Sequence, residues 1–273
     1  MRRIPAPAKI NLALVAGPLR PDGKHEITTV LQRVDLGDRV AIEPSGVGLV
    51  VDGFAGDTIV HRALELLAEE AGVDPAWRAT ITKRIPLTSG LGGGSSDAAA
   101  ALKLANETLP EPLGSGRLHA VAAALGSDVP FFLRPGPQLA QGDGTELQQI
   151  ALPQDFFVVL VVPHGQAKVS TAAVYAGHDR RGGSAGFAER RAALLDALAR
   201  VRRPRDLAAL PRNDLVSSPL AGELESVGAF RADVSGAGPT IYGLFHHRSR
   251  AEAARRRLRA SGRVWITVPT WYG

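Results

Sequence analysis

The sequence predicts a mixed fold of strands and helices that is divided between two domains. Strand-like and helix-like patterns occur in both halves of the 273-residue chain, and 45% of its residues are hydrophobic, which is enough for a sizeable core. The charge is uneven: residues 1–152 contain 14 basic and 17 acidic residues, a net of −3, whereas residues 153–273 contain 18 basic and 10 acidic residues, a net of +8. We therefore expect one domain over residues 1–152 and a second over residues 153–273.

Short β-branched segments of the first half are expected to be strands. Three of them cover residues 9–16, 39–43 and 47–51 and are bounded by Gly, Asp and Pro. Residues 58–71 change to a helical period, with apolar side chains on one face and charged side chains on the other. This pattern predicts an amphipathic helix, followed by a further strand at residues 79–85.

Helices are expected to follow in the first half, at the alanine-rich residues 98–105 and at residues 116–125. The second half is expected to form a small α/β sandwich. Its strands are predicted at residues 156–162, 240–245 and 264–268, and its arginine-rich helices at residues 188–201 and 251–260.

Composition excludes several classes of protein. The chain has no cysteine, which excludes disulfides, thiolate metal sites and a cysteine nucleophile. No apolar run approaches the roughly 18–20 residues that cross a bilayer, and the N-terminal residues lead into Pro, Lys and Asn rather than an apolar signal segment. We therefore expect a cytoplasmic protein without a membrane partner. The formal charge of +5 makes a polyanionic partner worth testing.

A glycine-rich loop follows the strand expected at residues 79–85. Four of the five residues 90–94 are glycines, and Ser95 and Ser96 lead into the alanine-rich helix. Glycine lets successive backbone N–H groups approach a ligand closely, so that the loop and the helix N-terminus can hold a phosphate. Ser95 or Ser96 could cap the helix or bind a phosphate or magnesium ion. The loop lacks the lysine of a P-loop and the ribose-binding acid of a dinucleotide fingerprint.

Four segments, in chain order, resemble the motifs of the galactokinase, homoserine kinase, mevalonate kinase and phosphomevalonate kinase (GHMP kinase) superfamily. They are residues 7–12 (PAKINL), 86–97 (PLTSGLGGGSSD), 125–132 (LGSDVPFF) and 234–240 (VSGAGPT). Within this superfamily, the triple glycine and the LGSDVPFF segment are most similar to the 4-diphosphocytidyl-2-C-methyl-D-erythritol kinase family. The segments RPDGKHEI and NDL, which begin at Arg20 and Asn213, resemble that family too.

The resemblance implies a two-domain α+β fold. Its N-terminal domain would be like ribosomal protein S5 domain 2, its C-terminal domain would be ferredoxin-like, and the active site would lie between them. The implied reaction transfers the γ-phosphoryl group of ATP, with Mg²⁺, to the 2-hydroxyl of the methylerythritol moiety of a cytidine diphosphate substrate. ATP and this small molecule of the non-mevalonate isoprenoid pathway are therefore the expected partners. The sequence assigns no metal ligands.

The resemblance also implies roles for residues in the matched motifs. Asp128 corresponds to the catalytic carboxylate and Lys9 to the catalytic cation, and which of them moves the proton first is left open. The implied substrate contacts are Asn11, His25, Thr171, Tyr175 and Gly236. The implied ATP contacts are Pro86, Leu87, Thr88, Ser89, Gly90, Leu91, Gly92, Gly93, Gly94, Ser95 and Ser96.

Two positions depart from the family pattern. Lys24 stands where the family has a tyrosine that contacts cytidine, and stacking a base on such a ring is worth about 1–3 kcal/mol. Tyr175 would then carry the stacking alone, while His25 could bond the cytosine edge. Thr58 stands where an Asn of the nucleotide pocket is expected, and a helix N-cap is an equally good interpretation of it.

Two other functions agree with parts of the sequence. Another small-alcohol kinase of the superfamily gains support from Lys24. A non-catalytic, basic RNA-binding protein on the same scaffold would use arginine clusters such as residues 255–259. However, aromatic residues make up only 5% of the chain, they do not interleave with these clusters, and no nucleic-acid motif is present. We therefore expect no nucleic-acid partner.

Overall fold

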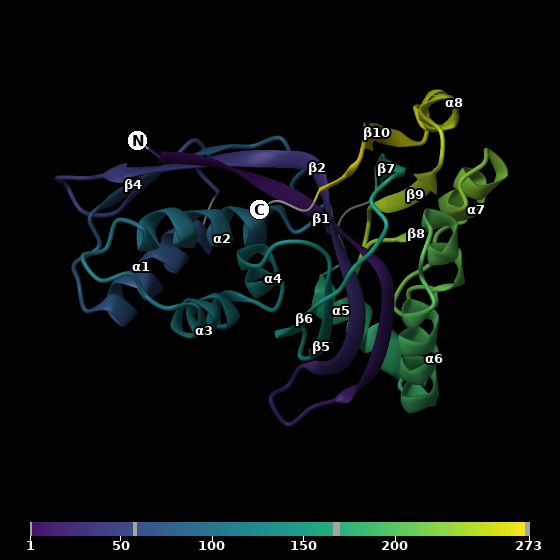
Figure 1. Cartoon of the computed structure of the whole chain (residues 1–273), viewed down its shortest axis with the longest axis horizontal. Helices are drawn as coiled ribbons and strands as arrows, with labels where there is room; N and C mark the ends of the chain where they lie inside the picture. Colours follow the sequence, from purple (N-terminus) through teal and green to yellow (C-terminus); the bar gives the residue numbers. More distant parts are fainter. Residues whose placement is uncertain (1, 57–58, 166–169, 271–273) are drawn as a thin grey trace.

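The chain forms two sheets that lie next to each other along the long axis of the molecule, each with helices packed against it (Figure 1). The structure is a computed structural model that describes residues 2–56, 59–165 and 170–270. No helix in these ranges is both long and apolar enough to cross a membrane.

The first sheet is built around the long antiparallel pair β1 (Arg2–Leu19) and β2 (His25–Pro44). Its strand order is β3-β4-β2-β5-β6, and β1 and β11 also pair with β2. The shorter strands are β3 (Val50–Asp52), β4 (Trp77–Thr82), β5 (Gln138–Gly142), β6 (Glu146–Gln149) and β11 (Pro269–Thr270). The register of β1 against β2 shifts between Pro7 and Ala8 and again between Asn11 and Ala13. These irregularities flank Lys9 and Asn11, as bulges near binding sites often do.

Helices α1 to α4 cover one face of the first sheet (Figure 1). They are α1 (Ile59–Ala71), α2 (Gly93–Asn106), α3 (Ser115–Leu125) and α4 (Val129–Leu133). Helix α2 lies between the sheet and the other helices, and its residues from Ser96 to Leu102 are all buried. The run of four alanines within that segment lets α2 approach its neighbours closely, and it fixes the position of the glycine-rich loop at the helix N-terminus.

The second sheet has the order β10-β7-β9-β8, and every neighbouring pair is antiparallel. Its strands are β7 (Phe157–Pro163), β8 (Arg231–Val234), β9 (Ile241–Phe245) and β10 (Gly262–Thr267). If these four strands are numbered 1 to 4 in chain order, they lie side by side in the sheet as 4-1-3-2. This is the strand order of a ferredoxin-like domain. The helical elements are α5 (Thr171–Arg180), α6 (Phe187–Ala199), the 3₁₀ turn Pro204–Ala209, α7 (Pro219–Ser226) and α8 (Arg248–Leu258).

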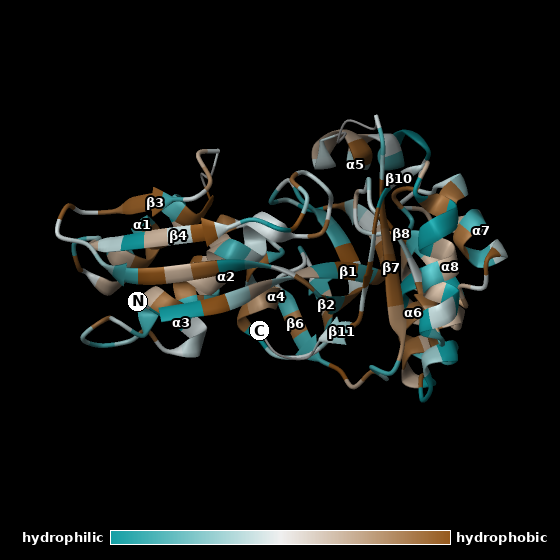
Figure 2. Cartoon of the chain, turned by 90° about the horizontal axis from the view of Figure 1, so that it is seen from above, coloured by the Kyte–Doolittle hydropathy of each residue, from teal (hydrophilic) through white to brown (hydrophobic). Residues whose placement is uncertain are grey.

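The two sheets share a hydrophobic core. Ile10 and Leu12 of β1 pack in one cluster with Val158 and Leu160 of β7 and Leu194 of α6. In Figure 2, β1 and β2 extend from the helix-covered part of the first sheet to the second sheet. Strand β11 returns the end of the described chain to the first sheet. The parts that carry the glycine loops are therefore held together by burial of apolar surface.

Most expected elements are present, with differences that have physical causes. The helix expected at residues 98–105 begins five residues earlier, because Gly92 provides its N-cap and neither serine caps it. The strand expected at residues 79–85 ends at Thr82, because the amides of Arg84 and Ile85 donate to the carboxylate of Asp38 instead of to a strand. The division after residue 152 stays a prediction.

A buried arginine holds α4 and the residues that follow it. Arg33 on β2 is fully buried, and its guanidinium group donates to the carbonyl oxygens of Phe131, Arg134 and Gly136. The group also lies 4.3 Å from the ring centroid of Phe131. Burial lowers the pKa of Arg33 to about 10, so it remains a cation at neutral pH. Because Asp128 directly precedes α4, Arg33 indirectly fixes the site.

We expect Arg33→Met to lower the free energy of unfolding by at least about 3 kcal/mol, since each buried carbonyl left without its donor costs about 1–3 kcal/mol. Urea unfolding followed by circular dichroism measures this loss. The control is Arg3→Met, at an exposed position of β1. A change of less than about 1 kcal/mol for Arg33→Met, equal to that of the control, would contradict the assigned role.

Candidate active site

A pocket of about 950 Å³ opens between the two parts of the molecule. It is lined by β1 and β2, the glycine-rich loop and the start of α2, the residues before α4, helix α5, and the loop between β8 and β9. Seventeen of the eighteen residues expected at the site line it: Lys9, Asn11, His25, Pro86, Leu87, Thr88, Ser89, Gly90, Leu91, Gly92, Gly93, Gly94, Ser95, Asp128, Thr171, Tyr175 and Gly236. The remaining one, Ser96, is buried beneath the loop. Thr58 lies outside the described residues.

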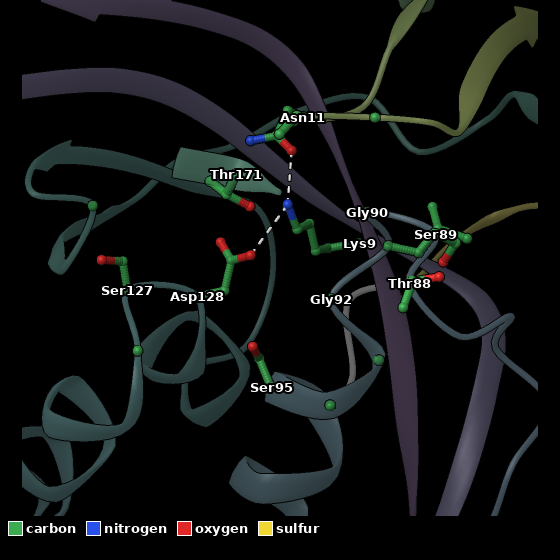
Figure 3. Close-up of a pocket in the computed structure, with 18 of the residues that line it drawn as sticks. Lys9, Asn11, Thr88, Ser89, Gly90, Gly92, Ser95, Ser127, Asp128 and Thr171 are labelled. Atoms are coloured by element: carbon green, nitrogen blue, oxygen red, sulfur yellow. Dashed lines mark hydrogen bonds and ion pairs between the residues drawn. The ribbon is translucent and has the colours of Figure 1, made fainter. Parts of the chain in front are cut away.

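Lys9 lies at the centre of the pocket (Figure 3). Its Nζ donates a hydrogen bond of 2.8 Å to Oδ1 of Asn11 and lies 3.3 Å from Oδ2 of Asp128. The Lys9 side chain is 5% exposed and that of Asp128 is 42% exposed, so the carboxylate is the partner that a bound molecule can reach. Asn11 is oriented in turn, because its Nδ2 donates to Oγ1 of Thr29 over 2.9 Å.

The glycine-rich loop is shaped by residues with left-handed backbone conformations. Gly90 has a φ of 82° and Gly92 a φ of 71°. A Cβ atom on Gly90 would lie 2.4 Å from the carbonyl oxygen of Gly238, and one on Gly92 would lie 3.0 Å from Cγ of Lys9. The backbone N–H of Lys9 also donates to the carbonyl oxygen of Leu91 over 2.9 Å. The left-handed conformation and the close packing therefore favour glycine at both positions, and they place the loop against the catalytic candidates.

The loop between β8 and β9 packs against the glycine-rich loop from the other side. Both the amide and the hydroxyl of Thr240 donate to the carbonyl oxygen of Ser89, over 3.2 and 2.7 Å. Gly236 has a φ of 58°, and a Cβ atom there would lie 3.2 Å from Oδ1 of Asn11. Asn213 holds this loop by donating to the carbonyl oxygen of Gly236 over 2.7 Å. Two glycine-containing loops, from the two parts of the chain, thus converge on Lys9.

The start of α2 is oriented to bind an anion. Its N-cap is Gly92, which has no side chain to accept a hydrogen bond from the first amides of the helix. The positive end of the helix dipole adds attraction for phosphate oxygens. Figure 3 shows Ser95 on this first turn with its hydroxyl directed toward the region of Asp128. The arrangement can therefore hold a phosphate chain on the loop next to a carboxylate and an ammonium group.

The sequence reasoning missed a buried charge cluster below the loop. Nζ of Lys83 donates hydrogen bonds to Oδ2 of Asp97, over 2.7 Å, and to Asp38. The carboxylate of Asp38 also accepts hydrogen bonds from the backbone amides of Arg84 and Ile85. Lys83 and Asp97 line the pocket. The cluster anchors the chain directly before the glycine-rich loop. The one available signal was the position of Asp97 next to Ser96, because Asp38 is distant in sequence.

The titration of this cluster follows from its burial. Burial and the charge of Asp38 together raise the pKa of Asp97 to about 7, although Lys83 opposes them. Burial alone would lower the pKa of Lys83, but Asp97 and Asp38 outweigh it, and that pKa is raised. Lys83 therefore remains cationic at neutral pH, while Asp97 takes up a proton more readily than an ordinary carboxyl group.

The opposite end of the pocket is formed by β2 and α5. The rings of His25 and Tyr175 are stacked, with centroids 4.6 Å apart. Lys24 is turned to Asp143, with its Nζ 2.6 Å from Oδ2 of that carboxylate. Burial would raise the pKa of Asp143, but hydrogen bonds from Lys24 and Thr145 outweigh it and lower that pKa to about 2. Since His25 covers one face of Tyr175, only its other face is left for a base.

We expect Asp97 to make stability depend on pH. Its pKa in the folded protein lies above the ordinary value near 4, so between about pH 4 and 7 the folded state binds more protons than the unfolded state, and the free energy of unfolding falls as pH rises. Asp97→Asn removes this dependence. We therefore compare the free energy of unfolding of the variant with that of the unmodified protein, measured in urea. The difference should favour the variant more at pH 8 than at pH 5.

The control for this comparison is Asp196→Asn, because the side chain of Asp196 is 75% exposed. Its effect should be the same at both pH values. If the difference in stability between Asp97→Asn and the unmodified protein did not change with pH, the raised pKa would be wrong.

The chain resembles known proteins over nearly its whole length. Models described as "GHMP kinases N terminal domain" and "GHMP kinases C terminal" match residues 58–136 and 191–264. A "4-diphosphocytidyl-2-C-methyl-D-erythritol kinase" of Anaeromyxobacter sp. (strain K) is 39% identical over 267 residues, covering 91% of this chain and 82% of the relative.

Solved structures give the same result. One solved structure is described as "Crystal structure of 4-(cytidine 5'-diphospho)-2C-methyl-D-erythritol kinase", and its sequence is 33% identical to this chain. The two structures match with a TM-score of 0.77 over 98% of this chain and 99% of the solved chain. A mevalonate kinase has the same TM-score over 99% of both chains at 12% identity, which shows the shared fold alone. The chain therefore belongs to the GHMP kinases, with their two-domain α+β fold, and within them to the 4-diphosphocytidyl-2-C-methyl-D-erythritol kinase family.

Proposed function

We propose that the chain transfers the γ-phosphoryl group of ATP to the 2-hydroxyl of 4-diphosphocytidyl-2-C-methyl-D-erythritol, a step of the methylerythritol phosphate pathway to isoprenoid precursors. The names of the relatives support the substrate. The observation that carries the chemistry is the pair of Lys9 and Asp128, 3.3 Å apart, beside a glycine-rich loop at a helix N-terminus. Phosphoryl transfer depends chiefly on positioning and on neutralising spread-out negative charge, and this arrangement supplies both.

The glycine-rich loop is the proposed site of the ATP phosphates. The loop residues 86–95 line the pocket, and the backbone conformations of Gly90 and Gly92 let the chain come close to a ligand. Amides at the start of α2 would bind phosphate oxygens, and the anchoring of the loop through Ser89 and Thr240 would limit its movement. In this role the loop aims the γ-phosphorus at the acceptor hydroxyl.

Asp128 and Lys9 are the proposed catalytic residues. The acceptor hydroxyl oxygen attacks the γ-phosphorus, the bond from that phosphorus to the bridging oxygen breaks, and ADP leaves. Asp128, which is the more exposed member of the pair, accepts the hydroxyl proton. Lys9 stabilises the ionised carboxylate and the negative charge on the transferring group. Oδ1 of Asn11 accepts a hydrogen bond from Nζ of Lys9 and so directs the remaining N–H donors of that group.

Mg²⁺ fits the donor set of the site. This ion is commonly bound by one or two protein oxygen ligands together with substrate phosphates. Among the described residues, no cluster of three or more His, Cys, Asp or Glu side chains could hold a metal. The hydroxyl of Ser95, on the first turn of α2, is the protein oxygen that would hold it together with the phosphates. When bound, the ion neutralises charge on the phosphates.

The end of the pocket near α5 is the proposed cytidine site. His25, Thr171 and Tyr175 line it, together with Asn11 and Gly236 nearer the catalytic pair. Burial raises the pKa of Tyr175 to about 12, with the charge of Asp128 adding to the effect, so the ring stays neutral and suited to stacking on a base.

We also propose that residues 1–152 and 153–273 are the two domains, and that both contribute to the site. Lys9, Asp128 and the phosphate loop would belong to the first, and Thr171, Tyr175 and Gly236 to the second. The cysteine-free sequence supports a cytoplasmic location. The arginine-rich surface of the second half favours no function of its own, so the RNA-binding alternative is not adopted.

The test is ADP release by the purified protein with ATP, Mg²⁺ and the cytidine diphosphate substrate. Release should depend on this substrate and should not occur with homoserine, mevalonate or phosphomevalonate. Asp128→Asn should lower kcat by about 100- to 10,000-fold, since it removes the base, and should leave the circular dichroism spectrum unchanged. ADP release that is independent of the cytidine substrate would refute the function, and near-normal kcat in the variant would refute the role of Asp128.

A second prediction concerns Lys24. Lys24→Tyr should lower KM for the cytidine substrate by at least about fivefold, because a stacking ring is worth about 1–3 kcal/mol, and should leave KM for ATP unchanged. Steady-state kinetics with each substrate varied separately measure both values. Lys24→Ala is the control, because it also breaks the ion pair with Asp143 but adds no ring. Equal KM values for the two variants would rule out stacking at this position.

A further inference from the structure

A second pocket, of about 410 Å³, lies on the face of the first sheet that the helices leave open. Arg3, Pro5 and Arg39 line it and share one side of the β1–β2 pair, because Pro5 is the register partner of Arg39 and Arg3 lies two residues before Pro5. Their neighbours Ala6 and Val40 belong to the core that α1 and α2 share with the sheet. Figure 2 views the open face, with the strands in front of these two helices.

Three arginines from separate segments of the chain line this second pocket. They are Arg3 on β1, Arg39 on β2 and Arg84, which lies two residues after the end of β4, and all three are exposed. Within the part of the chain that the structure describes, no ion pair or hydrogen bond engages their guanidinium groups. The exposed carboxylate of Asp35 lines the same pocket. The surface of the pocket therefore has a net positive charge.

Asp38 also lines the second pocket, but its carboxylate is fully buried and its partners come from within the protein. It accepts hydrogen bonds from Nζ of Lys83 and from the backbone amide of Arg84. The segment between the two pockets is fixed in this way: Lys83 lines the active-site pocket, and the next residue, Arg84, lines the second pocket. Because its backbone is already anchored, Arg84 loses less conformational freedom when it binds a ligand.

We propose that the second pocket binds a diphosphate group and is separate from the proposed ATP site. This inference does not rest on the proposed function. A guanidinium group donates two parallel hydrogen bonds to neighbouring oxygens of a phosphate. Three such groups favour an anion with more than one phosphate group, because a diphosphate group has more oxygens and more negative charge than a single phosphate.

The diphosphate group can be a free anion or the end of a larger molecule. Ile4, Pro5 and Pro7 also line the second pocket, and they offer apolar surface to a substituent beside the phosphates. Inorganic diphosphate and butyl diphosphate distinguish these sources. Tighter binding of the butyl ester identifies the end of a larger molecule, and tighter binding of inorganic diphosphate identifies the free anion. Either result supports a diphosphate site.

The test is isothermal titration calorimetry with the full chain saturated with ADP, in a buffer without Mg²⁺. ADP occupies the phosphate loop if the proposed function is correct, so the remaining binding reports the second pocket. The same titrations without ADP keep the test valid if ADP does not bind. Both probes and inorganic phosphate are titrated into the unmodified protein, Arg3→Gln, Arg39→Gln and the double variant. The control is Arg78→Gln, because Arg78 is on the adjacent strand β4, is paired with Asp52 and does not line the pocket.

The unmodified protein should bind at least one of the two diphosphate probes at least about tenfold more tightly than inorganic phosphate. Each single variant should weaken that binding at least about fivefold and the double variant at least about twentyfold, because charge-assisted hydrogen bonds are lost. Arg78→Gln should not alter it, and the circular dichroism spectra of all variants should be unchanged. Absence of binding by both probes, or equal affinity in the unmodified protein and the double variant, would overturn the proposal.

Discussion

The buried ammonium group of Lys9 is the interaction on which the site depends. A cation on a side chain that is only 5% exposed is costly unless opposite charge and hydrogen bonds compensate it. Oδ1 of Asn11 accepts a hydrogen bond from this group, and Asp128 supplies the opposite charge. Because Lys9 is on β1 and Asp128 directly precedes α4, this compensation holds two distant segments together. The arrangement that stabilises the charge in the folded protein is the same one that brings a base and a cation to one point.

Close backbone approach provides the rest of the geometry. The amide of Lys9 is bonded to the carbonyl oxygen of Leu91, and Gly90 lies against Gly238 with no room for a Cβ atom. The first contact joins the phosphate loop to β1, and the second joins it to the loop between β8 and β9. The apolar cluster between β1, β7 and α6 keeps these parts in register. A kinase site at this place therefore requires both sheets, although each glycine-containing loop belongs to a different one.

Local patterns in the sequence predicted the parts, and the family motifs predicted which residues meet. The helical period of residues 58–71 and the glycine-rich loop are each signals between near neighbours in the sequence. The structure has the loop, and it has the helix from Ile59 to Ala71. Helix α5 was missed, although Tyr175 within it was named. The pairs His25–Asp179 and Lys83–Asp38 could not be predicted, because their members are far apart in the chain and only the tertiary fold brings them together.

The central claim is that Lys9 and Asp128 act as one unit in the transfer step. A double-mutant cycle on kcat with Lys9→Met, Asp128→Asn and the double variant tests it most directly. If the pair acts as a unit, the double variant should lose no more activity than the more damaged single variant, to within about threefold. Losses that multiply, so that the double variant falls by the product of the two single effects, would mean that the residues act independently and would contradict the account.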